Sequence, residues 1–314
     1  MKIRFWGVRG SIPTPLSPDE VRRKISSVLA QVGPQDIRDN KSRELFLSKL
    51  PASLFGTVGG NTTCLEVRLE DGRVILFDAG TGLSRFAASA AKELSHPKEF
   101  HLFFTHFHWD HIQGFPFFTP QAFDGKCKIH VYSPREDVER ILREQMKPPY
   151  FPITMDTMQA KIEFHHLSAS PLRLGGAEIS WRGVKHPGAS FSYKVKDRSG
   201  AFIFSTDTEL SPEDFARSPE NQSFYERADV LVMDSQYTLD EAIEKYDWGH
   251  SSYSLAVDFA SEWKIKKLVL FHHEPLYNDN KMAAIEKSAR WYKSHINQDQ
   301  LDITIAREGL ELVI

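Results

Sequence analysis

The sequence has little cysteine, no long apolar run and no large excess of either charge. Only two cysteines, Cys64 and Cys127, occur in 314 residues, and both lie in apolar, strand-like runs. We therefore expect buried free thiols in a reducing compartment rather than a disulfide, with the cytoplasm as the default location. No run approaches the ~18 apolar residues of a membrane span, and residues 1–9 lack the apolar core of a signal peptide.

The near-neutral charge excludes strong, sequence-wide attraction to polyanions. Lys and Arg total 39 against 42 Asp and Glu, a formal net charge of −3. Nucleic acid and anionic membranes are therefore not favoured partners, although a local basic patch remains compatible with this balance. A chain of this length suggests about two domains, but β-rich enzymes often form one. We predict a single domain over residues 1–314.

Strand-like runs dominate both halves of the sequence, and each half closes with helical patterns. This order favours an α+β fold of two mixed β-sheets packed face to face, with helices outside. The predicted strands cover 2–8, 63–69, 73–78, 101–104, 128–132, 162–167, 177–185, 190–196, 201–205, 230–233, 268–271, 302–305 and 310–314. The predicted helices cover about 83–94, 135–146, 251–262 and 281–295.

A helical pair of different texture occupies about residues 17–52. Ser17 is a good N-cap, Pro18 suits the first helical position, and apolar residues recur at helical spacing until Gly33. A second helix is expected at about 41–50. We interpret the pair as an insertion in the domain.

The stretch from Thr105 to His111 carries the strongest chemical signal. It places His106, His108, Asp110 and His111 directly after a buried apolar run. Residues two apart in an extended segment point to the same side, so the first two histidines face one point, and the last two donors turn towards a second. Imidazole and carboxylate ligands suit zinc and also admit manganese or iron. The alternative, a capped helix start beside core histidines, rarely gives this spacing.

Further donors are expected where other buried strands end. His186, Asp207 and His272 each lie at such a position, where a rigid scaffold can aim a side chain. His273 is the adjacent competitor of His272.

The His-x-His-x-Asp-His motif at 106–111 resembles that of the metallo-β-lactamase-fold hydrolases. The resemblance is closest to their phosphodiesterase branch, which includes RNase Z-like transfer-RNA 3′-processing nucleases and phosphoribosyl cyclic phosphodiesterases. It covers nearly the whole chain except 16–57, and it implies a four-layer αββα sandwich with the site at one edge of the sheets. The supporting motifs lie at 7–13, 59–64, 77–82, 205–208, 248–252 and 270–273.

The resemblance also implies a dinuclear site holding two Zn²⁺, with Mn²⁺ possible. Carried over, the first ion is held by His106, His108 and His186, and the second by Asp110, His111 and His272. Asp207 bridges the two ions, and Asp78 orients a ligand histidine from outside.

The implied reaction is attack on a phosphodiester by a metal-bridging hydroxide. Asp110 orients that water or takes its proton, and His250 resembles the general acid of the RNase Z-like branch. Asp234, at a neighbouring strand end, is a candidate to orient His250. The open alternatives are a helix-capping role for His250 and a structural role for Asp234.

We expect the substrate to be a small cyclic phosphodiester or nucleotide. Transfer-RNA nucleases of this branch carry a protruding basic Gly/Pro-rich arm, which has no obvious equivalent here. The pair at 17–52 is interpreted as a lid or a homodimer contact, with a surface feature that has no such role as the open alternative. Tyr150 and Phe151 are candidates to stack on a base or sugar, with core packing as the open alternative, and Asn61 and Thr62 are candidates to reach the phosphate. The alternatives are an RNA 3′-end endonuclease, a thiolester hydrolase and a non-catalytic metal-binding sensor.

Overall fold

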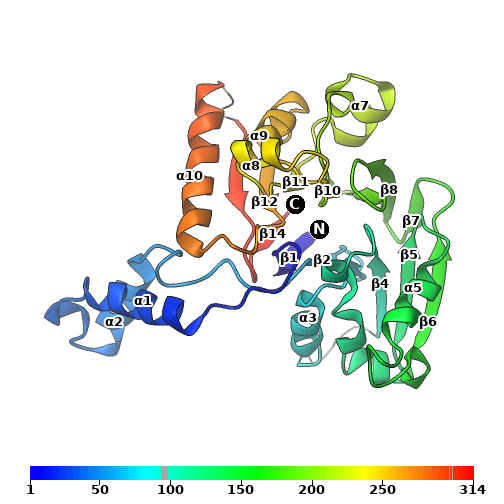
Figure 1. Ribbon diagram of the computed structural model, residues 1–314, viewed down its shortest axis with the longest axis horizontal. Helices are drawn as coiled ribbons and strands as arrows, with labels where there is room; N and C mark the ends of the chain where they lie inside the picture. The colour runs from blue at the N-terminus through cyan, green and yellow to red at the C-terminus, as the bar shows by residue number, and fades with distance from the viewer. Residues whose placement is uncertain (93–97, 297, 299) are drawn as a thin grey trace.

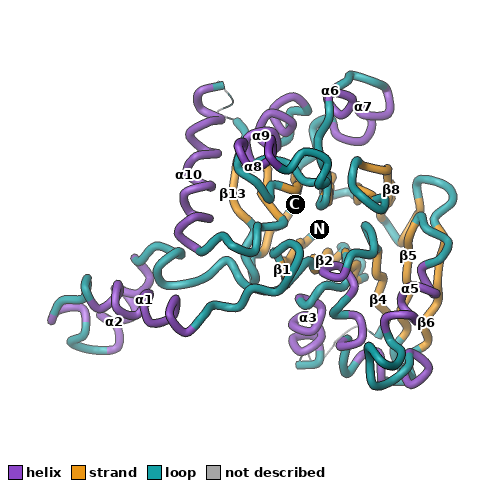
Figure 2. Tube along the Cα trace, viewed as in Figure 1, coloured by secondary structure: helices purple, strands orange, loops and turns teal. Residues whose placement is uncertain are grey.

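Two seven-stranded β-sheets pack face to face in the computed structural model, with helices on both outer faces (Figures 1 and 2). The structure describes residues 1–92, 98–296, 298 and 300–314. The first sheet runs in the order β14 (Glu311–Val313), β1 (Lys2–Gly7), β2 (Cys64–Arg68), β3 (Val74–Phe77), β4 (Glu99–Phe103), β5 (Lys128–Ser133), β6 (Lys161–His166). The second runs β13 (Asp302–Ile305), β12 (Lys267–Phe271), β11 (Val230–Asp234), β10 (Ala201–Ser205), β9 (Ser190–Lys196), β8 (Ala177–Val184), β7 (Leu172–Leu174).

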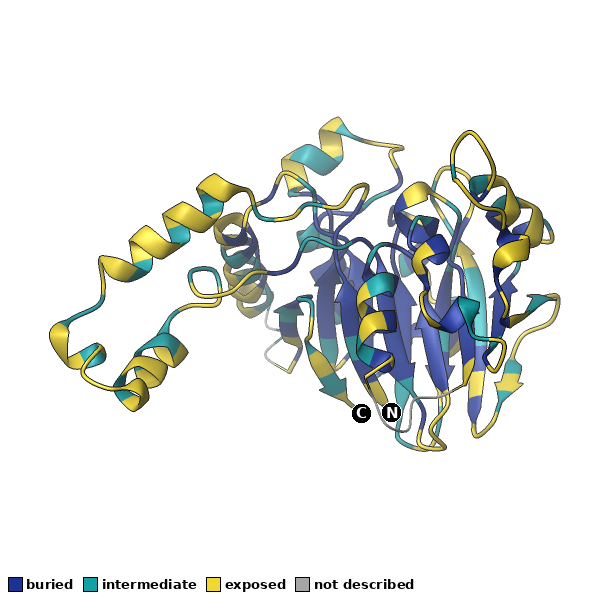
Figure 3. Cartoon of the chain, turned by 90° about the horizontal axis from the view of Figure 1, so that it is seen from below, coloured by how far each residue is buried: buried dark blue, intermediate teal, exposed yellow. Residues whose placement is uncertain are grey.

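Three apolar clusters hold the four layers together. One fills the space between the sheets, with Phe77 and Phe204 at its centre (ring centroids 5.5 Å apart). A second packs helices α3 (Gly82–Ala90) and α5 (Val138–Gln145) on the first sheet. The third packs α7 (Pro219–Tyr225), α9 (Tyr253–Glu262) and α10 (Asp279–His295) on the second. Figure 3 shows the buried strands between exposed helices, so the predicted αββα sandwich of mixed sheets is confirmed.

Most of the longer elements occur where the sequence predicted them, and several short ones were missed. The missed elements include β7, α7, α6 (Pro212–Phe215) and α8 (Leu239–Glu244). Helices α6 and α7 both begin with a serine followed by a proline, a start signal that was available in the sequence. The predicted helix at 83–94 ends earlier, and residues 93–94 lie outside the described residues. The remaining short helices are α4 (Trp109–Ile112), η2 (Phe115–Phe117), η3 (Gln121–Phe123) and η4 (Met155–Thr157).

The predicted helical pair forms an arm that projects from the body beside α10 (Figures 1 and 3). It consists of α1 (Pro18–Leu29), η1 (Pro34–Asp36) and α2 (Asn40–Lys49), and neither α-helix has a buried residue. A capping box between Ser17 and Glu20 starts α1. Lys24 ties the arm to Asp279 at the start of α10, with Nζ 2.8 Å from the carboxylate. The arm points away from the body, so a lid or dimer role remains a hypothesis.

The sheets bring several strand ends to one edge of the sandwich. Strands β3, β4 and β5 are parallel neighbours in the first sheet, as are β10, β11, β12 and β13 in the second. The carboxyl ends of parallel strands meet at a common edge, and that edge carries the residues predicted to bind metal. Cys64 and Cys127 are buried free thiols, as predicted. No helix within the described ranges is long and apolar enough to span a membrane.

Candidate metal centre

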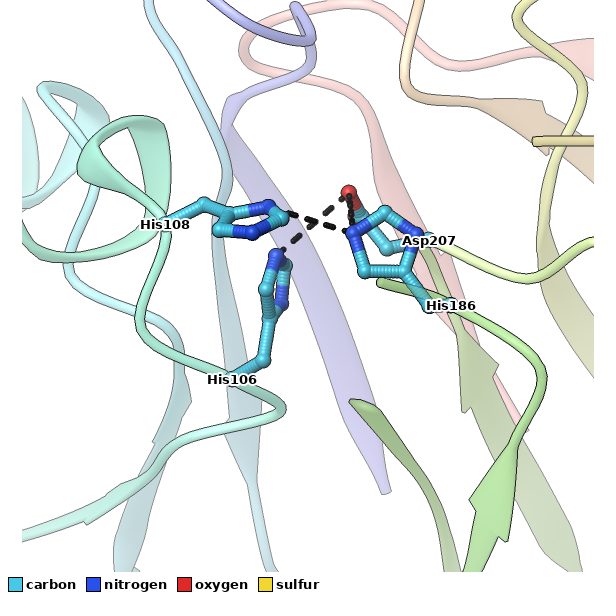
Figure 4. Close-up of side chains that lie close together, drawn as sticks. All are labelled: His106, His108, His186 and Asp207. Atoms are coloured by element: carbon cyan, nitrogen blue, oxygen red, sulfur yellow. Dashed lines mark hydrogen bonds and ion pairs between the residues drawn. The ribbon is translucent and has the colours of Figure 1, made fainter. Parts of the chain in front are cut away.

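Three histidines and one carboxylate converge at the first half of the centre (Figure 4). His106 and His108 follow β4, His186 follows β8, and Asp207 follows β10; one donor atom from each lies within 4.8 Å of the others. His108 Nδ1 and His186 Nε2 are 3.1 Å apart. Oδ1 of Asp207 lies 3.6 Å from His106 Nε2 and 3.7 Å from His186 Nε2.

The second half gathers Asp110 and His111 on α4 with His272, directly after β12. Nε2 of His111 and Nε2 of His272 are 3.4 Å apart, and each lies 3.3 Å from Asp110 Oδ2. The other oxygen of Asp207, Oδ2, is 3.1 Å from His111 Nε2 and 3.2 Å from His272 Nε2. Asp207 thus offers one oxygen to each group of histidines, the arrangement that a bridging ligand requires.

Four of the histidine rings make a hydrogen bond through the nitrogen that faces away from the centre. This bond determines which ring nitrogen faces the centre. His111 Nδ1 donates to Asp78 Oδ2 (2.8 Å), as predicted for that aspartate. His186 Nδ1 donates to the Gly249 carbonyl (2.8 Å), and His272 Nδ1 to Gln236 Oε1 (3.1 Å). The Thr105 hydroxyl donates to Asp78 Oδ2 (2.8 Å) and accepts from His106 Nδ1 (3.1 Å). Each of these rings therefore turns its Nε2 atom towards the centre, where it can bind a metal.

The donor set fits a divalent cation such as zinc. Nε2 of His106 is buried and has no hydrogen-bond partner among the described residues, which is costly unless a metal takes its lone pair. Burial lowers the pKa of His106 well below its usual value, so the ring is neutral. Burial opposes ionisation of Asp207 and Asp110, but the surrounding histidines hold both pKa values well below the usual range. Neutral imidazoles with ionised carboxylates are zinc ligands.

Three residues of this centre have left-handed backbone conformations that side chains disfavour. The φ angles are 60° at Asp78, 49° at Asp207 and 62° at His272. Each follows a strand end, where the left-handed turn redirects the chain. Such conformations cost about 1–3 kcal/mol each and persist where the surrounding structure enforces them, commonly at functional sites.

A histidine–aspartate pair lies beside the second half. His250 Nδ1 donates to Asp234 Oδ2 (2.7 Å), while Asp234 Oδ1 accepts from the Ser251 backbone (3.1 Å). The His250 ring stacks on His272 with centroids 5.0 Å apart. Burial disfavours the charged ring, but Asp234 outweighs it and raises the pKa of His250 to about 9. The N-cap of α9 is Ser252, so the capping alternative for His250 is wrong.

One of the two predicted phosphate contacts is corrected by the structure. The Thr62 side chain is fully buried and accepts from the Thr81 backbone (2.9 Å), so it has no exposed group for a substrate. Asn61 is half-buried and its Nδ2 donates to Glu308 Oε2 (3.0 Å), which fastens its loop.

The remaining candidates divide between the surface and the core. Phe151 packs on Phe117 (centroids 5.6 Å apart) against the helix-side core, whereas Tyr150 is 78% exposed. His273 Nε2 donates to the Ala306 carbonyl (2.8 Å), which removes it as the competitor of His272.

Two exposed tryptophans beside the centre were not predicted from the sequence. Trp109, between two candidate ligands, is 81% exposed, and Trp248, two residues before His250, is 62% exposed. Large exposed aromatic side chains are informative because water disfavours them. Their position in the motifs was the available signal.

The sandwich fold and the two groups of candidate metal donors, which share Asp207, together define a metal-dependent hydrolase. The family model described as "Beta-lactamase superfamily domain" matches residues 73–273, and the chain belongs to this superfamily. It is similar to Ribonuclease Z of Thermococcus kodakarensis, with 28% identity over 69% of this chain and 80% of that protein.

Solved structures agree on the fold. The metallo-beta-lactamase fold protein YhfI from Bacillus subtilis gives a TM-score of 0.65 at 15% identity, covering 99% of this chain and 98% of that one. The short form of human tRNase Z gives 0.61 at 16%, covering 100% and 99%. The predicted RNase Z-like resemblance and the predicted class, a metal-dependent phosphoric diester hydrolase, are confirmed.

Proposed function

We propose that the protein is a dinuclear phosphodiesterase that cleaves RNA near its 3′ end, as a transfer-RNA-processing endonuclease does. The observation that carries the dinuclear chemistry is the division of the Asp207 oxygens between two histidine groups. The RNA substrate is supported by the curated relatives, such as the Thermococcus kodakarensis protein, whose name is Ribonuclease Z. This replaces the small cyclic diester as the first candidate.

Two zinc ions, or manganese in their place, would be held by the seven donors described above. When bound, the ions supply Lewis acidity that activates water and offsets charge on the phosphate. Asp110 is fixed by the Ser11 backbone N–H, which donates to its Oδ2 (2.8 Å), so this ionised carboxylate is positioned to orient the attacking water.

The leaving group needs a proton, and His250 is positioned to donate it. Its Nδ1 is bound to Asp234, which leaves Nε2 as the proton donor to the leaving alkoxide oxygen as the P–O bond breaks. Because the pKa of His250 is raised to about 9, the ring carries that proton at neutral pH.

The exposed aromatic side chains support a substrate with unstacked bases. Trp109 lies between the candidate ligands His108 and Asp110, and Trp248 lies two residues before His250; base–aromatic stacking contributes about 1–3 kcal/mol per base. Cations lie nearby: Lys185 Nζ is 4.4 Å from the Tyr246 ring centroid, and Lys245 Nζ is 5.9 Å from that of Trp248. A flexible 3′ end would meet these groups next to the metals.

A small cyclic phosphodiester is the second candidate. It is favoured because a lysine near the site is already paired with carboxylates and attracts a polyanion less. Lys185 lies 2.6 Å from carboxylate oxygens of both Glu209 and Asp247, which offset its charge towards a polyanion. The net charge of −3 points the same way.

A comparative assay separates these candidates. Zinc- and manganese-loaded protein is given a precursor transfer RNA, 3′,5′- and 2′,3′-cyclic nucleotides and phosphoribosyl 1,2-cyclic phosphate, with Asp110→Asn as the inactive control. Cleavage of the RNA that Asp110→Asn abolishes is expected. Turnover confined to a cyclic diester would establish the second candidate, and inactivity on all substrates would leave a thiolester hydrolase or a metal-binding sensor.

A further inference from the structure

A second histidine cluster lies on the first sheet, away from the strand ends that carry the catalytic centre. It is built from Glu99 at the start of β4, His130 on β5, and Glu163 and His165 on β6. His130 pairs with Glu163 across the β5–β6 register, and Tyr132 pairs with His165. Strand β6 is the edge strand of this sheet, so the cluster spans its last three strands.

Three donor atoms of the cluster surround one point. His130 Nδ1 is 2.8 Å from His165 Nε2 and 3.3 Å from Glu163 Oε2, and the last two atoms are 3.9 Å apart. Donors around a tetrahedral zinc ion lie about 3.3 Å apart, because each bond is about 2.0–2.1 Å long. A position about 2 Å from all three atoms therefore exists. The three distances between the donor atoms differ by only about 0.6 Å or less from those of a tetrahedral zinc site.

The surroundings hold the two rings in place for a ligand. His130 Nε2 donates to Glu99 Oε1 (2.7 Å), which turns its Nδ1 lone pair inward, the same carboxylate–histidine arrangement that supports metal ligands elsewhere. His101 stacks on His130 (centroids 4.9 Å apart), and Tyr132 stacks on His165 (4.6 Å). His130 is buried while the His165 side chain is 37% exposed, so a cation has a path from solvent.

Lysines compete for the carboxylate of this cluster. Lys128 Nζ is 3.1 Å from Glu163 Oε2, and Lys161 Nζ is 2.7 Å from Oε1. A metal ion would displace Lys128 from Oε2 while Lys161 keeps Oε1. This competition makes the site weaker than the catalytic centre, where the described carboxylates of Asp110 and Asp207 have no lysine partner.

We propose that His130, His165 and Glu163 bind a third first-row divalent cation, such as zinc, which fastens the edge strand β6 to β5. Two imidazoles with one carboxylate suit zinc and its neighbours. An edge strand has unpaired backbone groups on one side, and a metal clasp there restrains fraying and edge-to-edge association.

The test is a zinc count on the full chain, with a matched control on the same strand. His165→Ala removes a ligand, and Glu163→Gln removes its charge at nearly constant shape. His166→Ala is the control, because His166 is exposed and its Nε2 contacts only the Pro134 carbonyl (3.1 Å) among the described residues. Each protein is equilibrated with zinc, freed of excess metal and assayed by mass spectrometry for zinc per chain.

We expect His165→Ala and Glu163→Gln to bind one zinc fewer than the wild type and His166→Ala, with phosphodiester hydrolysis unchanged. Zinc should also raise the melting temperature of His166→Ala more than that of His165→Ala. The difference of one zinc does not depend on what the catalytic centre binds. Equal zinc counts in all four proteins would overturn the proposal.

Discussion

Replacing Asp234 by asparagine should shift the pH dependence of RNA cleavage without removing the site. The carboxylate lies 2.7 Å from His250 Nδ1 and is the main influence that offsets the burial of that ring. Asparagine keeps an oxygen for the backbone N–H groups of Ser251 and Gln236, which now donate to Asp234 Oδ1. The substitution therefore removes charge rather than the local fold.

The expected magnitude follows from the shift at His250. Its pKa of about 9, against an ordinary 6.5, corresponds to about 3 kcal/mol in favour of the protonated ring. A general acid works only while protonated, so activity falls as pH rises through this pKa. At pH 8 a group of pKa 9 is roughly 90% protonated and one of pKa 6.5 about 3%, so Asp234→Asn should lose about 30-fold at that pH and recover below about pH 6.

Two substrates with different leaving groups make the assay specific. Cleavage of RNA releases an alkoxide, and this leaving group needs a proton. Bis(p-nitrophenyl) phosphate releases a nitrophenolate, which is stable without one. His250→Ala should lose about 10²–10⁴-fold on RNA at neutral pH, and both variants should hydrolyse the nitrophenyl ester nearly as the wild type does. An equal loss on both substrates at full metal content, or an unmoved alkaline limb in Asp234→Asn, would refute the general-acid assignment.

Three other predictions concern the metals, the packing around them and the arm. Chelation should lower the melting temperature, because metal at 1,000 times its dissociation constant stabilises the fold by about 4 kcal/mol; an unchanged value would argue against a resident metal. Gly10→Ala places a Cβ 2.5 Å from the His272 ring and should reduce zinc content and activity, whereas Gly183→Ala, with no atom within 4 Å of its Cβ, should not. Deleting residues 18–52 should change the preference between precursor transfer RNA and the nitrophenyl ester, and unchanged kinetics on every substrate would contradict a lid role for the arm.

The sequence was sufficient to predict which candidate metal donors lie together, but it did not predict the residues that surround them. His186 and Asp207 were found because apolar runs end just before them, and a run of that kind marks a buried strand. The partners of the histidines could not be found in this way, since Gln236 and Gly249 meet His272 and His186 only through the order of the strands.

The hydrogen bond of Asn61 could not be predicted for the same reason. Asn61 was a plausible donor to the phosphate by type, and its amide donates to Glu308, 247 residues further along the chain. Two residues so far apart in the sequence meet only because of how the whole chain folds. Local periodicity therefore cannot predict their contact. The cluster of His130 and His165 could not be predicted from the sequence for the same reason, because it arises from the β5–β6 register.

Zinc-specific anomalous scattering from crystals of the zinc-loaded protein tests the central claim most directly. We expect two peaks about 3.5–4 Å apart, one on each side of the Asp207 carboxylate. The first should lie among His106, His108 and His186, and the second among Asp110, His111 and His272. A single peak, or two peaks that do not share Asp207, would contradict a dinuclear phosphodiesterase built on this bridge.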